Sequence, residues 1–207
     1  MRLTQALPLA AAAAALIGAV AAPALAAQPD SSMPPADASQ PADTQGGSTF
    51  SQDEVVVAAS NFFGVASSRV AGAVERIFAE QGEPVGYIQG SEIAGAIGAG
   101  VRYGKGTLVM RTGEEREVFW QGPSIGFDTG GNASRVFTLV YDLGNPDGIF
   151  RRYPGVEGAA FLVAGISVTY QRAEGVTLAP MRTGVGLRAG VNAGYTAYSA
   201  QRRWLPF

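Results

Sequence analysis

The chain of 207 residues carries 15 lysines and arginines against 17 aspartates and glutamates, a formal net charge of −2 at pH 7. It contains neither histidine nor cysteine, which excludes zinc sites of the Cys/His kind, thiol nucleophiles, disulfides and iron–sulfur clusters. The hydrophobic fraction of 47% is enough for one domain with a core, and the mild acidity argues against nucleic acid as a partner.

The first 26 residues have the pattern of a secretory signal peptide. Arg2 gives a basic start, residues 6–22 form an apolar run, and Ala24 and Ala26 supply the small residues that a signal peptidase reads. A transmembrane anchor is the alternative, but the run is rich in alanine and lacks a basic flank that would stop transfer. We therefore expect cleavage after Ala26 and a free periplasmic protein.

Residues 27–50 are rich in proline, serine, alanine, aspartate and glutamine. Such a composition cannot bury enough apolar surface to offset the entropy lost on ordering. We expect a disordered linker, with a short binding motif as the alternative, followed by a single domain over residues 51–207.

A pair of helices is predicted at the start of this domain. Ser51 followed three residues later by Glu54 is a capping box, and the apolar residues behind it recur at helical spacing, which predicts a helix over residues 52–63. A second amphipathic pattern follows, which Ser67 or Ser68 could cap. The polar faces mix both charge signs, so we expect the pair to cover a sheet, and not to lie on a membrane surface.

From residue 84 onward, short runs rich in β-forming residues alternate with glycine. This pattern predicts a mostly β fold: a small soluble antiparallel β-barrel or strongly curled sheet over residues 84–207, covered by the two N-terminal helices of residues 51–82. Residues 98–104 and 184–190 share the pattern GxGxRxG, which in a strand places glycines and one arginine on the same face. Glycines there allow sharp curvature, whereas a phosphate-binding loop would need a following helix.

Two later runs are predicted as strands. Residues 159–170 form a nearly continuous apolar run, typical of a strand buried on both faces, and residues 185–198 would form the last strand. The terminal Phe207 raises the alternative of an outer-membrane barrel. Pro206 and the shortness of many runs, against the ~9 to 11 residues that a bilayer requires, argue that the barrel does not span a membrane.

Three stretches carry a resemblance to a known family. FWQGPSIGFDTGGNASRVFTLVYDL, MRTGVGLRAGVNAGY and the closing RRWLPF resemble the envelope integrity protein A family of the alphaproteobacterial periplasm, over about residues 50–207. The resemblance implies a small soluble β-barrel with helices, no assigned enzyme activity, and a part in keeping the cell envelope intact under stress. The same segment is more faintly similar to the SYLF lipid-binding domain, although Asp128 stands where that pattern often has glutamine.

These patterns suggest a ligand site on the curled sheet. An isolated arginine on a glycine-rich face could contact an anionic head group, while aromatic side chains line an apolar part that receives a lipid or a lipid-linked envelope precursor. The candidate ligand-binding residues are Arg102, Trp120, Phe127, Asp128, Phe137 and Arg188. In the alternative interpretation the aromatic residues are ordinary core, and the arginines pair with Asp128, Asp142 or Glu157.

We predict no catalytic residue, cofactor or metal, and therefore a non-enzymatic function. One alternative is a module that binds other envelope proteins. The other is a hydrolase that uses Asp128 together with Asp142 or Glu157, which would require two carboxyl groups about 5 to 10 Å apart across a cleft.

Overall fold

The structure is a computed structural model, and it describes residues 47–128, 133–183 and 194–203. The chain divides into two units, Met1–Asp43 and Thr44–Phe207, and the helices and strands given below all belong to the second. The predicted signal peptide and the linker up to residue 46 lie outside the described residues. Within the described ranges, none of the helices combines the length and the apolar character that crossing a bilayer requires.

The two predicted helices are present as α1 (Gln52–Phe63) and α2 (Ser67–Gln81). The capping box is confirmed, since the Glu54 amide donates to the Ser51 side chain and the Ser51 amide donates to Glu54 Oε2 at 2.9 Å. The predicted cap of α2 is wrong: Ala66 holds the N-cap position without a side-chain hydrogen bond, and Ser67 already belongs to the helix. A cap needs extended backbone, and the turn after α1 delivers that conformation one residue earlier than expected.

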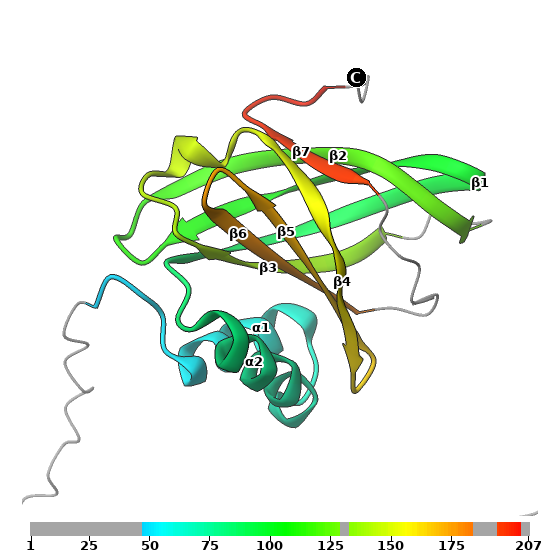
Figure 1. Ribbon diagram of the computed structural model, residues 1–207. Helices are drawn as coiled ribbons and strands as arrows, with labels where there is room; N and C mark the ends of the chain where they lie inside the picture. The colour runs from blue at the N-terminus through cyan, green and yellow to red at the C-terminus, as the bar shows by residue number, and fades with distance from the viewer. Residues whose placement is uncertain (1–46, 129–132, 184–193, 204–207) are drawn as a thin grey trace, which may run out of the picture. The chain divides into compact units, whose positions relative to one another are not determined.

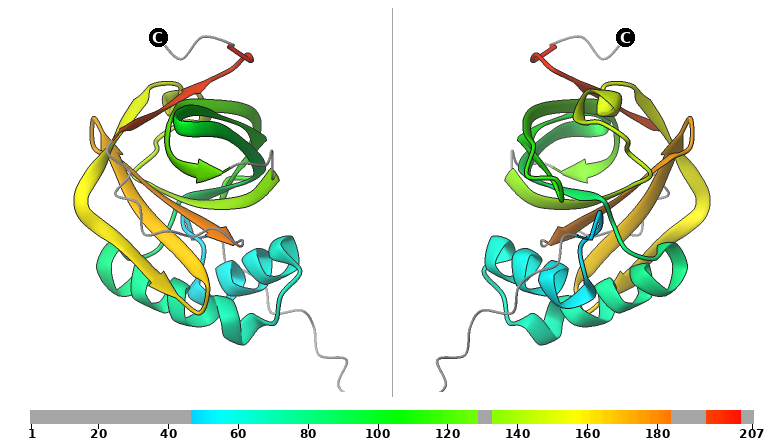
Figure 2. Two further views of the ribbon diagram at one scale, coloured as in Figure 1. Left: turned by 90° about the vertical axis from the view of Figure 1, so that its right-hand side faces the viewer. Right: turned by 90° about the vertical axis from the view of Figure 1, so that its left-hand side faces the viewer.

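The predicted mostly β fold is confirmed, and the strands form a closed antiparallel barrel (Figures 1 and 2). Their order around the barrel is β1-β2-β7-β4-β5-β6-β3. In Figure 2 the strands curve into a ring, and α1 and α2 lie together against one side of it. The elements of the barrel are β1 (Gly86–Met110), β2 (Glu115–Asp128), β3 (Ala133–Tyr141), the 3-10 helix η1 (Pro146–Ile149), β4 (Arg152–Val163), β5 (Ile166–Ala173), β6 (Val176–Thr183) and β7 (Tyr195–Ser199).

The long strand β1 contributes two arms to the barrel. Residues 86–93 pair with β3, and residues 96–109 pair with β2. The arms return toward each other, because the amide of Arg111, just beyond one end, donates to the carbonyl of Val85, just before the other, at 2.9 Å. A Cβ atom on Gly90 would overlap the Lys105 backbone, so only glycine permits this close approach.

Apolar side chains form two cores, one on each side of the barrel wall. The helix-facing core joins α1 and α2 to the outer faces of β3, β5 and β6, and its largest members include Ile77, Phe137, Leu139, Tyr170 and Met181. The second core fills the barrel itself and includes Ile88, Leu108, Trp120, Ile149, Tyr153, Leu178 and Tyr198. The wall is therefore buried on both faces where the helices cover it.

The prediction of one continuous strand over residues 159–170 is wrong. The run is the hairpin of β4 and β5, which turns at Ala164 and Gly165, both with positive φ (49° and 81°). Two central residues with positive φ are typical of the tight turn that matches strand twist. Alanine is an unusual residue for that turn, and the apolar run on either side of it hides the reversal.

The predicted last strand lies only partly within the described residues. Within the described residues it is β7, which begins at Tyr195, and most of the predicted strand over residues 185–198 lies outside them. Strand β7 pairs with β2 on one side and β4 on the other, and so it closes the barrel between them.

Candidate functional site

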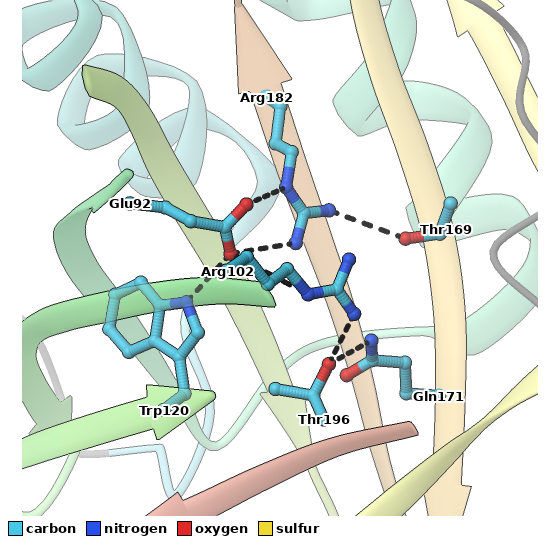
Figure 3. Close-up of polar contacts among 7 residues, drawn as sticks. All are labelled: Glu92, Arg102, Trp120, Thr169, Gln171, Arg182 and Thr196. Carbon is cyan, nitrogen blue, oxygen red and sulfur yellow. Dashed lines mark hydrogen bonds and ion pairs between the residues drawn. The ribbon is translucent and has the colours of Figure 1, made fainter. Parts of the chain in front are cut away.

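A buried network of charged groups occupies the inside of the barrel (Figure 3). The carboxylate of Glu92 on β1 meets the guanidinium groups of Arg182 and Arg102, with Arg182 Nε 3.3 Å from Glu92 Oε1 and Arg102 Nε 4.0 Å from Glu92 Oε2. The indole of Trp120 on β2 donates from Nε1 to Glu92 Oε2 at 2.8 Å. Glu92 and Arg102 are each at most 6% exposed, so these charges lie out of water.

Polar side chains from two further strands, β5 and β7, surround the arginines. Arg102 Nη2 donates to Thr196 Oγ1 on β7 at 2.8 Å, and Gln171 Nε2 on β5 donates to the same oxygen at 2.8 Å. Arg182 Nη1 lies 3.5 Å from Thr169 Oγ1 on β5. The network thus ties together β1, β2, β5, β6 and β7, which lie around much of the barrel circumference.

The charges around Glu92 keep it ionised. Burial raises the pKa of its carboxyl, but the attraction of Arg182 and Arg102 and the hydrogen bond from Trp120 together outweigh burial, so the net pKa lies below the usual 4.5. Burial and the repulsion of Arg182 lower the pKa of Arg102, and Glu92 partly offsets them. A carboxylate of lowered pKa is a poor proton carrier near neutral pH, so this arrangement suits a fixed ion pair better than acid–base catalysis.

Glycines on β1 make room for the indole of Trp120 inside the barrel. A Cβ atom on Gly104 would overlap the indole ring, and one on Gly90 would come within 2.6 Å of its Cη2 atom. The indole also packs against Tyr198, with ring centroids 5.9 Å apart. Arg102 and Gly104 lie on the same inward face, as the first GxGxRxG copy predicts.

A groove of about 250 Å³ lies on the opposite side of the same two strands. Outward-facing residues of β1 and β2 and the segment after β7 line it, together with Gly104 and Trp120, whose side chain points into the barrel. The lining residues are Ser91, Ile93, Tyr103, Gly104, Lys105, Phe119, Trp120, Gln121, Ser199, Arg202 and Arg203. Residues 200–203, drawn in red beyond β7, turn back over the outside of β2 (Figure 1).

The groove has an apolar floor and a basic rim. Ile93 is 53% exposed and lies among the aromatic lining residues Tyr103 and Phe119. The Lys105 ammonium lies 5.4 Å from the centroid of the Phe119 ring, and the Arg202 guanidinium lies 6.0 Å from it. With Arg203, three basic side chains line the groove, and no acidic residue is among its described lining residues.

The structure separates the predicted ligand-binding residues. Arg102 and Trp120 lie together inside the barrel, whereas Phe137 lies in the helix-facing core, 5.1 Å from the Tyr87 ring. Phe127 and Asp128 pair through their backbones with β1 at the end of β2, and their side chains are outside the description. Arg188 lies outside the described residues.

Arg102 lies beside a carboxylate that was not among its predicted partners. This carboxylate is Glu92, and Glu92 also pairs with Arg182. Glu92 lies four residues after Ile88 on β1, and alternate residues of a strand share a face. Its inward position could therefore have been inferred once the strand was known. Its pairing with Arg182 could not, because 90 residues separate the two in sequence.

The hypothesis of a hydrolase with two paired carboxylates receives no support from a described distance between such groups. Asp142 is exposed just after β3, and the side chains of Asp128 and Glu157 are not described. Across the described part of the chain, no three acidic side chains gather as a metal site would require.

Comparisons with known proteins agree with this fold. Residues 48–207 match the family model of envelope integrity protein A. The chain is also similar to a beta-barrel-like, uncharacterized protein from Brucella abortus of known crystal structure, with 44% identity and a TM-score of 0.71 over 78% of this chain and 100% of that one. No functionally curated protein matches. The chain, with its closed barrel and its two covering helices, belongs to the envelope integrity protein A family.

Proposed function

We propose that this protein supports the integrity of the cell envelope under stress as a non-catalytic periplasmic protein that binds a lipid or another amphiphile on its barrel. The family gives the envelope role. The observation that carries the binding proposal is the groove outside β1 and β2, where an apolar floor meets a basic rim. An amphiphile has the same division, so each of its parts would find a matching surface.

The floor of the groove exposes apolar side chains to water. Ile93 is half exposed, and Tyr103 and Phe119 are partly buried beside it. Covering such surface with a hydrocarbon chain releases roughly 25 cal/mol per Å² of apolar area. The groove is thus a place where an apolar ligand would gain free energy without opening the packed interior of the barrel.

The interior network supports the groove from behind. Trp120 is among the lining residues of the groove, and its indole donates from Nε1 to Glu92, so the buried ion pair holds this residue in position. In this proposal Trp120 contacts the ligand directly, and Arg102 shapes the site from inside the barrel. Ligand contacts by Phe127, Asp128, Phe137 and Arg188 stay predictions.

Mass spectrometry of bound lipids tests the binding proposal. The protein would be purified without detergent from the envelope fraction of its host, extracted with organic solvent, and its lipids compared with those of the Ile93→Ser variant. We expect a stoichiometric amphiphile in the wild type and its loss from the variant. Leu162→Ser is the matched control, since Leu162 is 55% exposed on β4, away from the groove.

A complementation experiment tests the envelope role. Deletion of the gene should sensitise cells to detergent, and the wild-type gene should restore resistance, whereas Ile93→Ser should restore it only in part. Full rescue by Ile93→Ser, with no lipid on the purified wild type, would contradict amphiphile binding. That outcome would favour a protein partner, which cross-linking in cells would then identify.

The periplasmic location has its own test. The proposal rests here on the signal-peptide pattern of residues 1–26 and on the absence of cysteine. We expect the protein in the fraction released by osmotic shock, with a mature N-terminus at Ala27. A protein that retained residues 1–26 in the cytoplasm would contradict this location.

A further inference from the structure

The groove has a polarity that narrows the class of its ligand. We propose that it takes a single-chain amphiphile with an anionic head group, free of the membrane, whose head lies at Arg202 and Arg203 and whose chain lies along Ile93, Tyr103 and Phe119. This inference rests on the proposed function. It adds the charge of the head, the number of chains and the direction in which the ligand lies.

The charge of the head follows from the rim. Lys105 lies 2.6 Å from Glu117, an ion pair on the β1 and β2 side, so part of its charge is already balanced. The segment after β7 adds two consecutive arginines, Arg202 and Arg203, which are exposed and line the same groove. A guanidinium binds carboxylate or phosphate oxygens in a planar, two-pronged geometry, so this end of the groove is complementary to an anionic group.

The number of chains follows from the size of the groove. Its volume is about 250 Å³, below the ~300 to 1,000 Å³ of sites that enclose drug-sized ligands. One chain segment fits beside Tyr103 and Phe119, whereas two acyl chains of a membrane phospholipid would leave most of their surface in water. A fatty acid or a lysophospholipid therefore fits better than a diacyl lipid.

The direction of the ligand follows from the order of the lining residues. Arg202 and Arg203 follow β7, which pairs with β2 at Phe119. Ile93 comes from the first arm of β1 and Tyr103 from its second arm, so both lie on the strand beyond β2 in the barrel order. The aromatic ring of Phe119 thus stands between the basic rim and the exposed Ile93, where a chain would cross it.

Tryptophan fluorescence can measure this binding. The chain has two tryptophans, and Trp204→Phe leaves Trp120, which lies in the strand wall behind the groove, as the single emitter. The full purified protein with this change would be titrated with dodecanoate, dodecyl maltoside and dodecyltrimethylammonium below their micelle concentrations, and with inorganic phosphate. We expect saturable, one-to-one binding of dodecanoate and at least about tenfold weaker binding of the other three.

Matched variants locate the site. We expect Arg203→Gln to weaken dodecanoate binding about threefold to fivefold. The control is Arg172→Gln, which removes the same charge from an exposed position on β5 and should leave binding unchanged. We expect Ile93→Ser to weaken binding about tenfold, and Leu162→Ser to have no effect. Both test residues are exposed, so a folding defect should not mask the result.

Three other outcomes of the titration would each contradict a specific part of the inference. If dodecyl maltoside binds as tightly as dodecanoate and Ile93→Ser weakens both, the anionic head is wrong while amphiphile binding stands. If only phosphatidylglycerol vesicles bind, with no monomer, the occupant is a membrane surface and the single-chain ligand is wrong. If none of these probes binds, the inference and the proposed function both fall.

Discussion

The inside of the barrel and the groove outside it use the same residue types under opposite conditions. Inside, Arg102 is 5% exposed and is held by Glu92 and Thr196, so its charge is compensated by fixed partners. Outside, Arg203 is exposed, so water compensates much of its charge. A buried charge needs its partner at all times, whereas a solvated charge can exchange water for a ligand. Burial, and not residue type, therefore separates an architectural arginine from one available for binding.

Trp120 connects the two regions. Its ring is packed inside the barrel against Tyr198 and over Gly104, and the residue is also among those that line the groove on the other side of the wall. Its hydrogen bond to Glu92 makes the position of the indole depend on the buried ion pair. Changes that disturb the interior should therefore lower stability first and groove binding as a consequence, whereas changes on the rim should lower binding alone.

Removal of the buried carboxylate should have the largest effect. Glu92→Gln leaves two guanidinium groups inside the barrel without their anion, and loss of one member of a buried ion pair costs about 3 to 5 kcal/mol. Denaturant unfolding followed by circular dichroism measures the change. The control is Glu117→Gln, which breaks the exposed pair with Lys105 and should cost no more than about 1 kcal/mol. Equal losses in the two variants would remove the distinction between the two regions.

Filling the space under the indole should have the next largest effect. The methyl group of Gly104→Ala would overlap the Trp120 ring, and forcing a buried ring to move costs about 1 to 3 kcal/mol. Gly144→Ala is the control, because a Cβ atom there meets nothing within 4 Å, and it should change stability by less than about 0.5 kcal/mol. Thermal unfolding of both variants checks the comparison, and an unchanged Gly104→Ala melting temperature would contradict the packing.

At acid pH the difference in the free energy of unfolding between wild type and Glu92→Gln should disappear. The folded pKa of Glu92 is lowered below 4.5, so its contribution to stability is present above about pH 4.5 and is lost as the pH falls through the folded pKa. The neutral amide of the variant cannot take up this proton. Unfolding free energies measured between pH 7 and pH 3 should therefore converge for the two proteins, and a constant gap would show that Glu92 does not titrate in this way.

A rim charge should have the smallest effect on stability. Arg203 is exposed beyond β7, so Arg203→Gln should change the free energy of unfolding by less than about 0.5 kcal/mol while it weakens binding of the anionic amphiphile. Denaturant unfolding and the fluorescence titration on the same preparation give both numbers. A loss of stability comparable to that of Glu92→Gln would mean that the rim is architectural.

The parts of the fold that depend on local chemistry were predictable. The capping box of Ser51 and Glu54 places the start of α1, because four consecutive residues are enough to form it. Alternation of apolar and small residues, with many glycines, predicts a curled β structure, since the period of two residues is a property of the strand itself. The reversal at Ala164 and Gly165 was missed, because it lies within an apolar run and uses a residue that seldom occupies such a turn.

The candidate site was predictable only in part. Arg102 and Trp120 stood out as an isolated charge and an aromatic residue in a glycine-rich region, and they do meet around Glu92. The groove could not be foreseen, because it takes Ile93 and Phe119 from two paired strands and Arg203 from the segment after the last described strand. Nothing in the spacing of these residues brings them together.

By itself the sequence determined the helices, the β character of the rest and the absence of thiol and imidazole chemistry, because each follows from neighbouring residues or from composition. Tertiary structure alone decided which charges became buried partners and which stayed on the surface. The register of β1 against β3, and of β3 against β6, sets Glu92 beside Arg182 across 90 residues of sequence. Long-range register depends on all strands at once, so no local pattern encodes it.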